Sequence, residues 1–189
     1  TTGSVNNSDW MLDDDGIITM LVRHNNNAVR ANGKRYFYRD FEEKKVRVIA
    51  LDTQDIDITF DNDGNVEIDP LRVYGIRQAQ IEWLCDTALN VPSDDWKILI
   101  TMHVGLYTSE DGFPGNEVLI NRDSIRNILN KYVAKDIYSY ADTDTTHDGY
   151  FTVSGSGTFA NYHGTLVAVL SGHSHEDGYT NRNGFNAIQ

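Results

Sequence analysis

The stretch Leu166-Val167-Ala168-Val169-Leu170-Ser171-Gly172-His173-Ser174-His175 decides the expected fold. Five apolar residues followed by a polar end that contains glycine are typical of a strand covered on both faces. A second short apolar run extends from Lys97 to Met102, and His103 closes it. Because ligands of open α/β sheets gather at the carboxyl ends of the strands, we expect these histidines to share one edge of a sheet.

Amphipathic helices are expected between the strands. Apolar residues at helical spacing predict one helix from about Gly75 to Asn90 and another that has Asn121 as its N-cap. The alternation of buried strands with helices predicts an α/β layered fold. The apolar stripes of the two helices are Ile81, Leu84, Cys85, Ala88 and Leu89, and Ile125, Ile128, Leu129, Tyr132 and Val133.

A β-hairpin is expected before the first helix. Its strands are predicted at Tyr36 to Tyr38 and at Val46 to Leu51, with a charged turn from Glu42 to Lys45. Asp52 and Thr53 follow the second strand. Short polar side chains at such a position close a strand by bonding to nearby backbone, so we expect both residues to be structural rather than catalytic.

Two polar segments are expected to be loops. Asp61-Asn62-Asp63-Gly64-Asn65 has the spaced acids of a calcium loop. The bidentate Glu that ends an EF-hand loop is absent, so a hairpin tip is the preferred interpretation. The segment from Tyr138 to Phe159 is the one long loop-like stretch, and we expect it to form a substrate-side excursion or a disordered flap.

The composition limits the class of protein. A length of 189 residues fits one domain, and 28 acidic against 16 basic residues give a net charge of −12. This charge repels nucleic acids and anionic membrane surfaces. The longest apolar run is much shorter than the roughly 20 residues of a membrane helix. We therefore expect no membrane insertion and no nucleic-acid partner. The single cysteine, Cys85, is expected to be a small buried hydrophobe.

Three histidines are expected to form a cluster that binds metal, namely His103, His173 and His175. Side chains two apart on an extended strand point to one side, so His173 and His175 would present two imidazoles to one site. Gly172 would let the backbone turn and let ions approach closely. Hydrolytic sites with two metals hold their ions about 3.5–4 Å apart, which suits neighbouring imidazoles.

The other three histidines lie in polar surroundings. His24 is among asparagines, His147 is in an acidic loop, and His163 precedes Gly164 at an expected turn. We expect all three to be solvated and outside the cluster, although a mobile loop could bring His147 to the site.

From about Asn32 onward, the sequence resembles the calcineurin-like metallophosphoesterases. The most specific match is the Gly172-His173-Ser174-His175 end of an apolar strand; Gln80-Ile81-Glu82-Trp83-Leu84 and the strand that ends at His103 also match in order. The resemblance implies a four-layer α/β/β/α sandwich with mixed sheets. It also implies that His103 and His173 bind one divalent metal ion and His175 a second. The metal could be Mn, Fe, Zn or Co, because histidine-rich sites accept all four.

Three motifs that this family carries earlier in its sequence do not occur here. These are Asp-x-His, Gly-Asp-x-x and Gly-Asn-His-Asp or Glu, which supply the bridging Asp, further ligands and the histidine that assists the leaving group. We therefore expect residues 1–189 to form a single, incomplete domain. Residues 32–189 resemble the family and residues 1–31 are unassigned. The expected partner is the remaining amino-terminal part of a longer protein.

The resemblance implies a hydrolase with two metal ions. Its substrate would be a small phosphomonoester or phosphodiester, attacked by metal-activated water. The isolated chain is expected to be inactive or nearly so, because the bridging carboxylate would be missing. The alternative is a catalytically inactive scaffold or binding module on the same fold. Retention of His103, His173 and His175 favours the enzyme.

Overall fold

The central feature is a mixed seven-stranded sheet, seen in a computed structural model that describes residues 28–31, 33–112, 118–182 and 184–189. The pairs β3–β4, β4–β7 and β7–β9 are parallel, and the pairs β1–β2, β2–β3 and β8–β9 are antiparallel. In sheet order the strands are β1 (Ala28–Arg30), β2 (Phe37–Phe41), β3 (Val46–Ala50), β4 (Lys97–Thr101), β7 (Thr165–Leu170), β9 (Phe185–Ile188) and β8 (Tyr179–Arg182). The predicted α/β class is confirmed.

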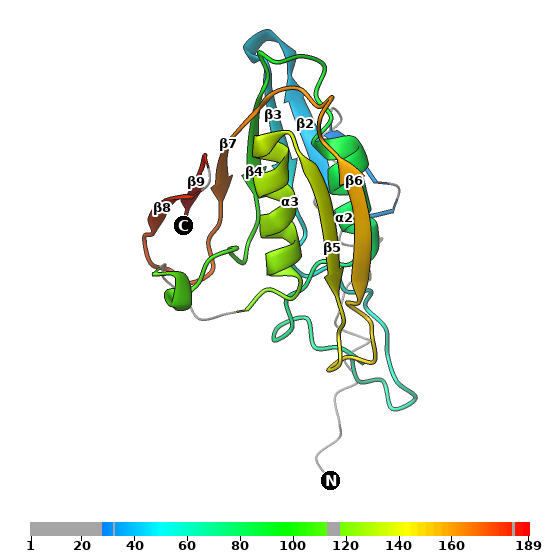
Figure 1. Ribbon diagram of the computed structural model, residues 1–189. Coiled ribbons are helices and arrows are strands. Elements are labelled where there is room, and N and C mark those ends of the chain that lie inside the picture. The colour runs from blue at the N-terminus through cyan, green and yellow to red at the C-terminus, as the bar shows by residue number, and fades with distance from the viewer. Residues whose placement is uncertain (1–27, 32, 113–117, 183) are drawn as a thin grey trace.

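A second layer covers one face of this sheet (Figure 1). It contains α2 (Gln78–Trp83), the π-helical turn η3 (Leu84–Ala88), α3 (Arg122–Ala134) and a separate two-stranded sheet of β5 (Ile137–Asp142) and β6 (Val153–Thr158). Ile49, Ile100 and Leu166 of the large sheet are buried in one core with Ile125 and Leu129 of α3. The predicted apolar runs are therefore core strands, because burial of these side chains removes apolar area from water.

The predicted hairpin is confirmed as β2 and β3, with Phe41 opposite Val46. The short 3-10 helix η2 (Glu42–Lys44) forms the charged turn, and Lys45 ends it with a left-handed φ of 51°. Arg47 is buried on β3, where its guanidinium binds the carboxylate of Asp40 with both contacts at 2.7 Å. A buried charge needs such a partner, and this pair joins the two strands of the hairpin.

The two predicted helices are present with shorter bounds. The first begins at Gln78 rather than Gly75, because the backbone of Gly75 forms bridges to Gln54 and Ile120. The second follows Asn121 as predicted, but the Asn121 side chain makes no cap. Its amide instead donates to the carbonyl oxygens of Ile76 (2.8 Å) and Phe151 (2.7 Å).

The prediction of a long loop from Tyr138 to Phe159 is wrong at both ends of this segment, because residues 138–142 belong to β5 and residues 153–158 to β6. Residues 143–152 form the loop that connects the two strands. Tyr138 and Tyr140 alternate with exposed residues on β5 and are buried. The glycines opposite them make this packing possible. A Cβ on Gly155 would lie 2.6 Å from the hydroxyl oxygen of Tyr140, and one on Gly157 would lie 2.5 Å from that of Tyr138.

The segment around Asp61 is a hairpin tip, as preferred from the sequence. Phe60 and Val66 form an antiparallel bridge across it. The Asp61 carboxylate accepts the backbone N–H groups of Asp63 (2.9 Å) and Asn65 (2.8 Å), and Gly64 has a left-handed φ of 77°. The carboxylate therefore stabilises the turn itself.

Candidate metal centre

Two neighbouring parallel strands carry His103 and His173 to the same edge of the sheet. Thr101 at the end of β4 is opposite Leu170 at the end of β7. Pairing continues past the strands, because the N–H of Gly172 donates to the carbonyl oxygen of His103 at 3.0 Å. The two histidine-bearing loops are therefore fastened through their backbones, as the strand-end argument predicted.

The rings of His103 and His173 are in direct contact. His103 Nε2 lies 2.9 Å from His173 Nδ1, and the ring planes are inclined at 86°. The prediction that these two imidazoles converge is confirmed. Burial, with the nearby charges of His173 and His175, lowers the pKa of His103. The lowered pKa favours the neutral imidazole, which is the form that binds metal.

The backbone at His173 and His175 is not extended, so the predicted strand geometry is wrong there. Strand β7 ends at Leu170, and both histidines have a left-handed φ, 79° for His173 and 57° for His175. Only a few per cent of residues other than glycine adopt this backbone conformation, although Asn, Asp and His do so more often than other types. Residues in such sparsely populated backbone regions cluster at functional sites. The second ion assigned to His175 stays a prediction.

The described residues do not complete a metal site. No group of three His, Cys, Asp or Glu side chains in this part of the chain is arranged to hold one ion. Gly172 has open space around its Cβ position and no left-handed φ, so packing and backbone geometry do not require glycine there.

The remaining histidines have other partners. His163 Nδ1 lies 2.9 Å from Asp94, just before β7 begins. His147 was expected to be solvated, but its ring is only 20% exposed because it lies against Phe151 and the Asp144 carboxylate. His24 lies outside the described residues.

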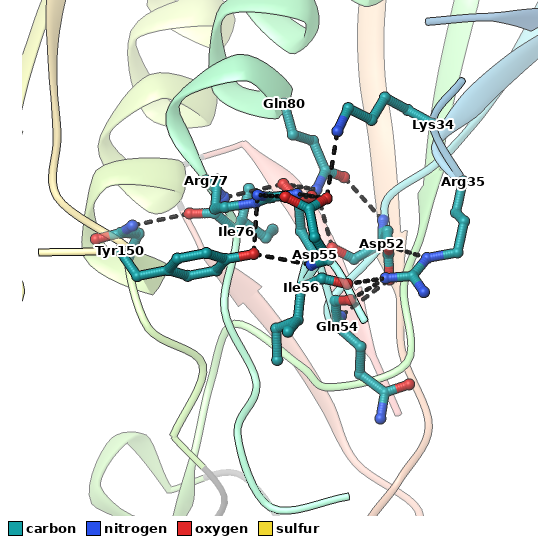
Figure 2. Close-up of polar contacts among 12 residues, drawn as sticks. Lys34, Arg35, Asp52, Gln54, Asp55, Ile56, Ile76, Arg77, Gln80 and Tyr150 are labelled. Carbon is teal, nitrogen blue, oxygen red and sulfur yellow. Dashed lines mark hydrogen bonds and ion pairs between the residues drawn. The ribbon is translucent and has the colours of Figure 1, made fainter. Parts of the chain in front are cut away.

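Asp52 and Thr53 bond to nearby backbone after β3, as predicted from the sequence. The buried Thr53 hydroxyl accepts the N–H of Val104, which follows His103, at 3.3 Å. One Asp52 oxygen accepts the Arg35 Nε–H at 2.7 Å and the other accepts the N–H of Gln54 at 2.9 Å. Figure 2 shows the Asp52 contacts. Both side chains therefore shape the loop after β3.

A cluster of charged side chains lies beside this loop (Figure 2). Arg77 binds Asp55 at 3.0 Å and Asp57 at 2.6 Å. The Tyr150 hydroxyl accepts a hydrogen bond from Arg77 at 2.9 Å and another from the N–H of Asp57 at 2.8 Å. The hydrogen bond from Arg77 lowers the pKa of Asp57 to about 2. These contacts join the β5–β6 loop to the loop after β3.

Two further side chains complete the description. Cys85 is buried, and burial raises the pKa of its thiol to about 12, which confirms the prediction that it is an inert hydrophobe. The Tyr74 ring lies edge-on to His173, with centroids 5.0 Å apart. This contact was not predicted from the sequence. The sequence signal for it is an aromatic residue directly before Gly75.

Comparisons with known proteins identify no relative of this chain. No protein-family model matches the chain, and no curated protein or solved structure matches it. Among the described residues, no helix has the length and apolar character needed to cross a membrane. The function is therefore argued from the residues themselves.

Proposed function

We propose that the protein is a metal-dependent phosphoesterase in which His103 and His173 bind one divalent ion and His175 a second. The observation that carries this proposal is the 2.9 Å separation of His103 Nε2 and His173 Nδ1 at the carboxyl edge of two parallel strands. The 2.9 Å contact is that of a hydrogen bond between the two rings. At metal–nitrogen distances of about 2.0–2.1 Å, two imidazoles on adjacent positions of one ion have their nitrogens roughly 3 Å apart, so an ion would need only a small rearrangement of these rings.

The described residues fit part of such a centre. Two neutral imidazoles bring no negative charge, and a catalytic ion in a protein has at least three protein ligands. The further donors, with carboxylates among them, would come from outside the described residues. The ion would be Mn²⁺, Fe²⁺, Zn²⁺ or Co²⁺, which all accept imidazole. A second sheet packed on this one would make the proposed four-layer sandwich.

The residues of this chain would orient the site rather than carry out the proton transfers. When bound, a pair of divalent ions activates water and neutralises charge on a phosphoryl group. The Gly172 N–H joins the two histidine loops, and Thr53 joins the His103 loop to the loop after β3. The lowered pKa of His103 keeps protons from competing with metal near neutral pH. The substrate would be a small phosphomonoester or phosphodiester.

The test is metal binding and turnover in a protein that contains this chain and the sequence that precedes it. Bis-p-nitrophenyl phosphate and p-nitrophenyl phosphate are assayed with Mn²⁺, and Co²⁺ binding is followed by calorimetry. His103→Ala and His173→Ala should each lower affinity for metal at least tenfold and abolish turnover. The matched control is His163→Ala, which alters a histidine bonded to Asp94 before β7 begins. Full turnover by His103→Ala would overturn the proposal.

A scaffold that has lost catalysis is the second candidate. The observation in its favour is that the described residues hold no set of three donors for one ion. In that case the protein would show no metal-dependent turnover in the same assay. The 189-residue chain assayed alone is expected to show little or no activity under the enzyme proposal, so a comparison of both proteins separates the two candidates.

A further inference from the structure

The loop that carries His173 has little regular structure of its own. Residues 171–178 form neither helix nor strand, and His173 itself has a φ of 79°. An imidazole on such a loop can point in several directions unless a neighbour fixes it, because rotation about χ2 of histidine is broad. Its orientation decides whether Nδ1 faces His103, so the neighbour matters for the site.

Tyr74 is the neighbour that the structure places against this ring. The ring centroids of Tyr74 and His173 are 5.0 Å apart with an interplanar angle of 67°, an edge-on contact. His173 Nδ1 also faces His103 Nε2. The imidazole is therefore in contact with both an aromatic ring and its partner histidine.

The backbone of Tyr74 is held firmly from both sides. Its carbonyl oxygen accepts the N–H of Ile120 at 2.9 Å, and the N–H of Gly75 donates to the carbonyl oxygen of Thr53 at 2.8 Å. Phe151 fills the space beside Gly75 so closely that a Cβ there would lie 2.4 Å from the ring. The segment cannot shift far without breaking these contacts, because the protein interior is closely packed.

The side chain of Tyr74 is also fixed at its far end. Its hydroxyl donates to the carbonyl oxygen of Leu71 at 3.0 Å, and its ring packs partly against the hydrophobic core. A tyrosine has few rotatable bonds, so these two contacts are enough to define the position of its ring. The Tyr74 ring, held by these contacts, thus lies beside a histidine on an irregular loop.

We propose that Tyr74 is a positioning residue that holds the His173 imidazole with Nδ1 toward His103. The ring orientation follows from the contacts alone. Its consequence for metal binding rests on the proposed function, in which both imidazoles share one ion. Residues that orient a ligand from outside the metal shell typically change metal affinity by about 10–100-fold when they are removed.

The experiment compares Tyr74→Ala and Tyr74→Phe in the full chain without metal, by NMR. In the wild type and Tyr74→Phe, nuclear Overhauser effects should connect the ring protons of His103 and His173. Tyr74→Ala should lose them, because the ring that limits His173 is gone. The control is Tyr179→Ala, which removes a tyrosine that is 67% exposed on β8 and should leave the effects unchanged. Persistence of the effects in Tyr74→Ala would overturn the proposal.

Titration with Co²⁺ alone separates this inference from the proposed function. The affinity of Tyr74→Ala should fall about tenfold, and Tyr74→Phe should restore it. If the wild type binds no Co²⁺ while the NMR result is as expected, Tyr74 still positions His173 and the metal proposal fails. If Tyr74→Ala does not fold, the spectrum of the wild type is the test. Absence of nuclear Overhauser effects between the rings of Tyr74 and His173 would show that the rings are not in contact and would overturn the proposal.

Discussion

The hydroxyl oxygen of Thr53 accepts a hydrogen bond from the N–H of Val104 at 3.3 Å, and both groups are buried. This bond ties the loop after β3 to the residue that follows His103. The two loops leave the sheet at neighbouring parallel strands, so this side-chain hydrogen bond extends the link between them beyond the backbone pairing of β3 and β4.

Thr53→Val should destabilise the protein by about 1–3 kcal/mol, because it leaves the Val104 N–H buried without an acceptor. Urea unfolding measures this loss. Thr53→Ser keeps the hydroxyl and should behave like the wild type to within about 1 kcal/mol, since a single buried methyl group contributes about that much. A loss for Thr53→Ser with wild-type stability for Thr53→Val would show that packing of the Thr53 methyl group, and not the hydrogen bond, is what stabilises the loop.

Gly157→Ala should destabilise the β5–β6 hairpin by about 1–3 kcal/mol, because the added methyl group overlaps the buried ring of Tyr138. Gly155→Ala should do the same through Tyr140. Ser156→Ala is the matched control, since Ser156 is exposed on the same strand between the two glycines. Thermal and urea unfolding give the comparison. Wild-type stability for both glycine variants would mean that the tyrosine rings move aside freely.

The same glycines explain where the sequence analysis failed. Ser154-Gly155-Ser156-Gly157 has the composition of a flexible linker, and nothing within that window indicates a strand. The glycines are needed because Tyr138 and Tyr140 of the neighbouring strand occupy the space where side chains would lie. This is a contact between residues far apart in the sequence, and local propensity does not encode it.

The positions of His103 and His173 could be predicted better from the sequence. Continuous apolar runs at β4 and β7 predicted two buried strands, and therefore the meeting of His103 and His173. The sequence did not predict the left-handed backbone at His173 and His175, because the apolar run before them was taken to continue as an extended strand. Tyr74 was missed because its contact with His173 joins two irregular segments.

Asp57→Asn should reduce the loss of stability on acidification. In the folded protein, the hydrogen bond from Arg77 lowers the pKa of Asp57 from 3.8 to about 2. A lowered carboxyl pKa contributes stability above the unfolded value, and this contribution disappears as the pH falls from about 4 to about 2. The side chain is 44% exposed, so after allowance for solvent screening the contribution is about 1 kcal/mol or less.

Urea unfolding at pH 6 and at pH 2.5 tests this dependence. Asp57→Asn should be slightly less stable than the wild type at pH 6, and this difference should be smaller at pH 2.5. Asp63→Asn, at the exposed hairpin tip, is the control and should follow the wild type at both values. A wild-type pH dependence in Asp57→Asn would show that other groups dominate acid unfolding.

Asp52→Asn should lower stability and leave the proposed metal-dependent turnover nearly unchanged. The Asp52 side chain is 14% exposed and accepts hydrogen bonds from the Arg35 Nε–H and the N–H of Gln54, so its carboxylate is used within the fold. An amide loses the charge that strengthens the bond to Arg35, and a hydrogen bond to a charged group contributes about 1.5–3 kcal/mol. Asp69→Asn is the control, because Asp69 pairs with an Arg72 side chain that is 84% exposed and should contribute less than about 1 kcal/mol. Unfolding in urea and kcat with bis-p-nitrophenyl phosphate are measured on the same preparations. A large fall in kcat with unchanged stability would give Asp52 a direct part in the chemistry. A purely structural carboxylate affects the reaction only through the fold, so it cannot alter the chemical step while stability is preserved.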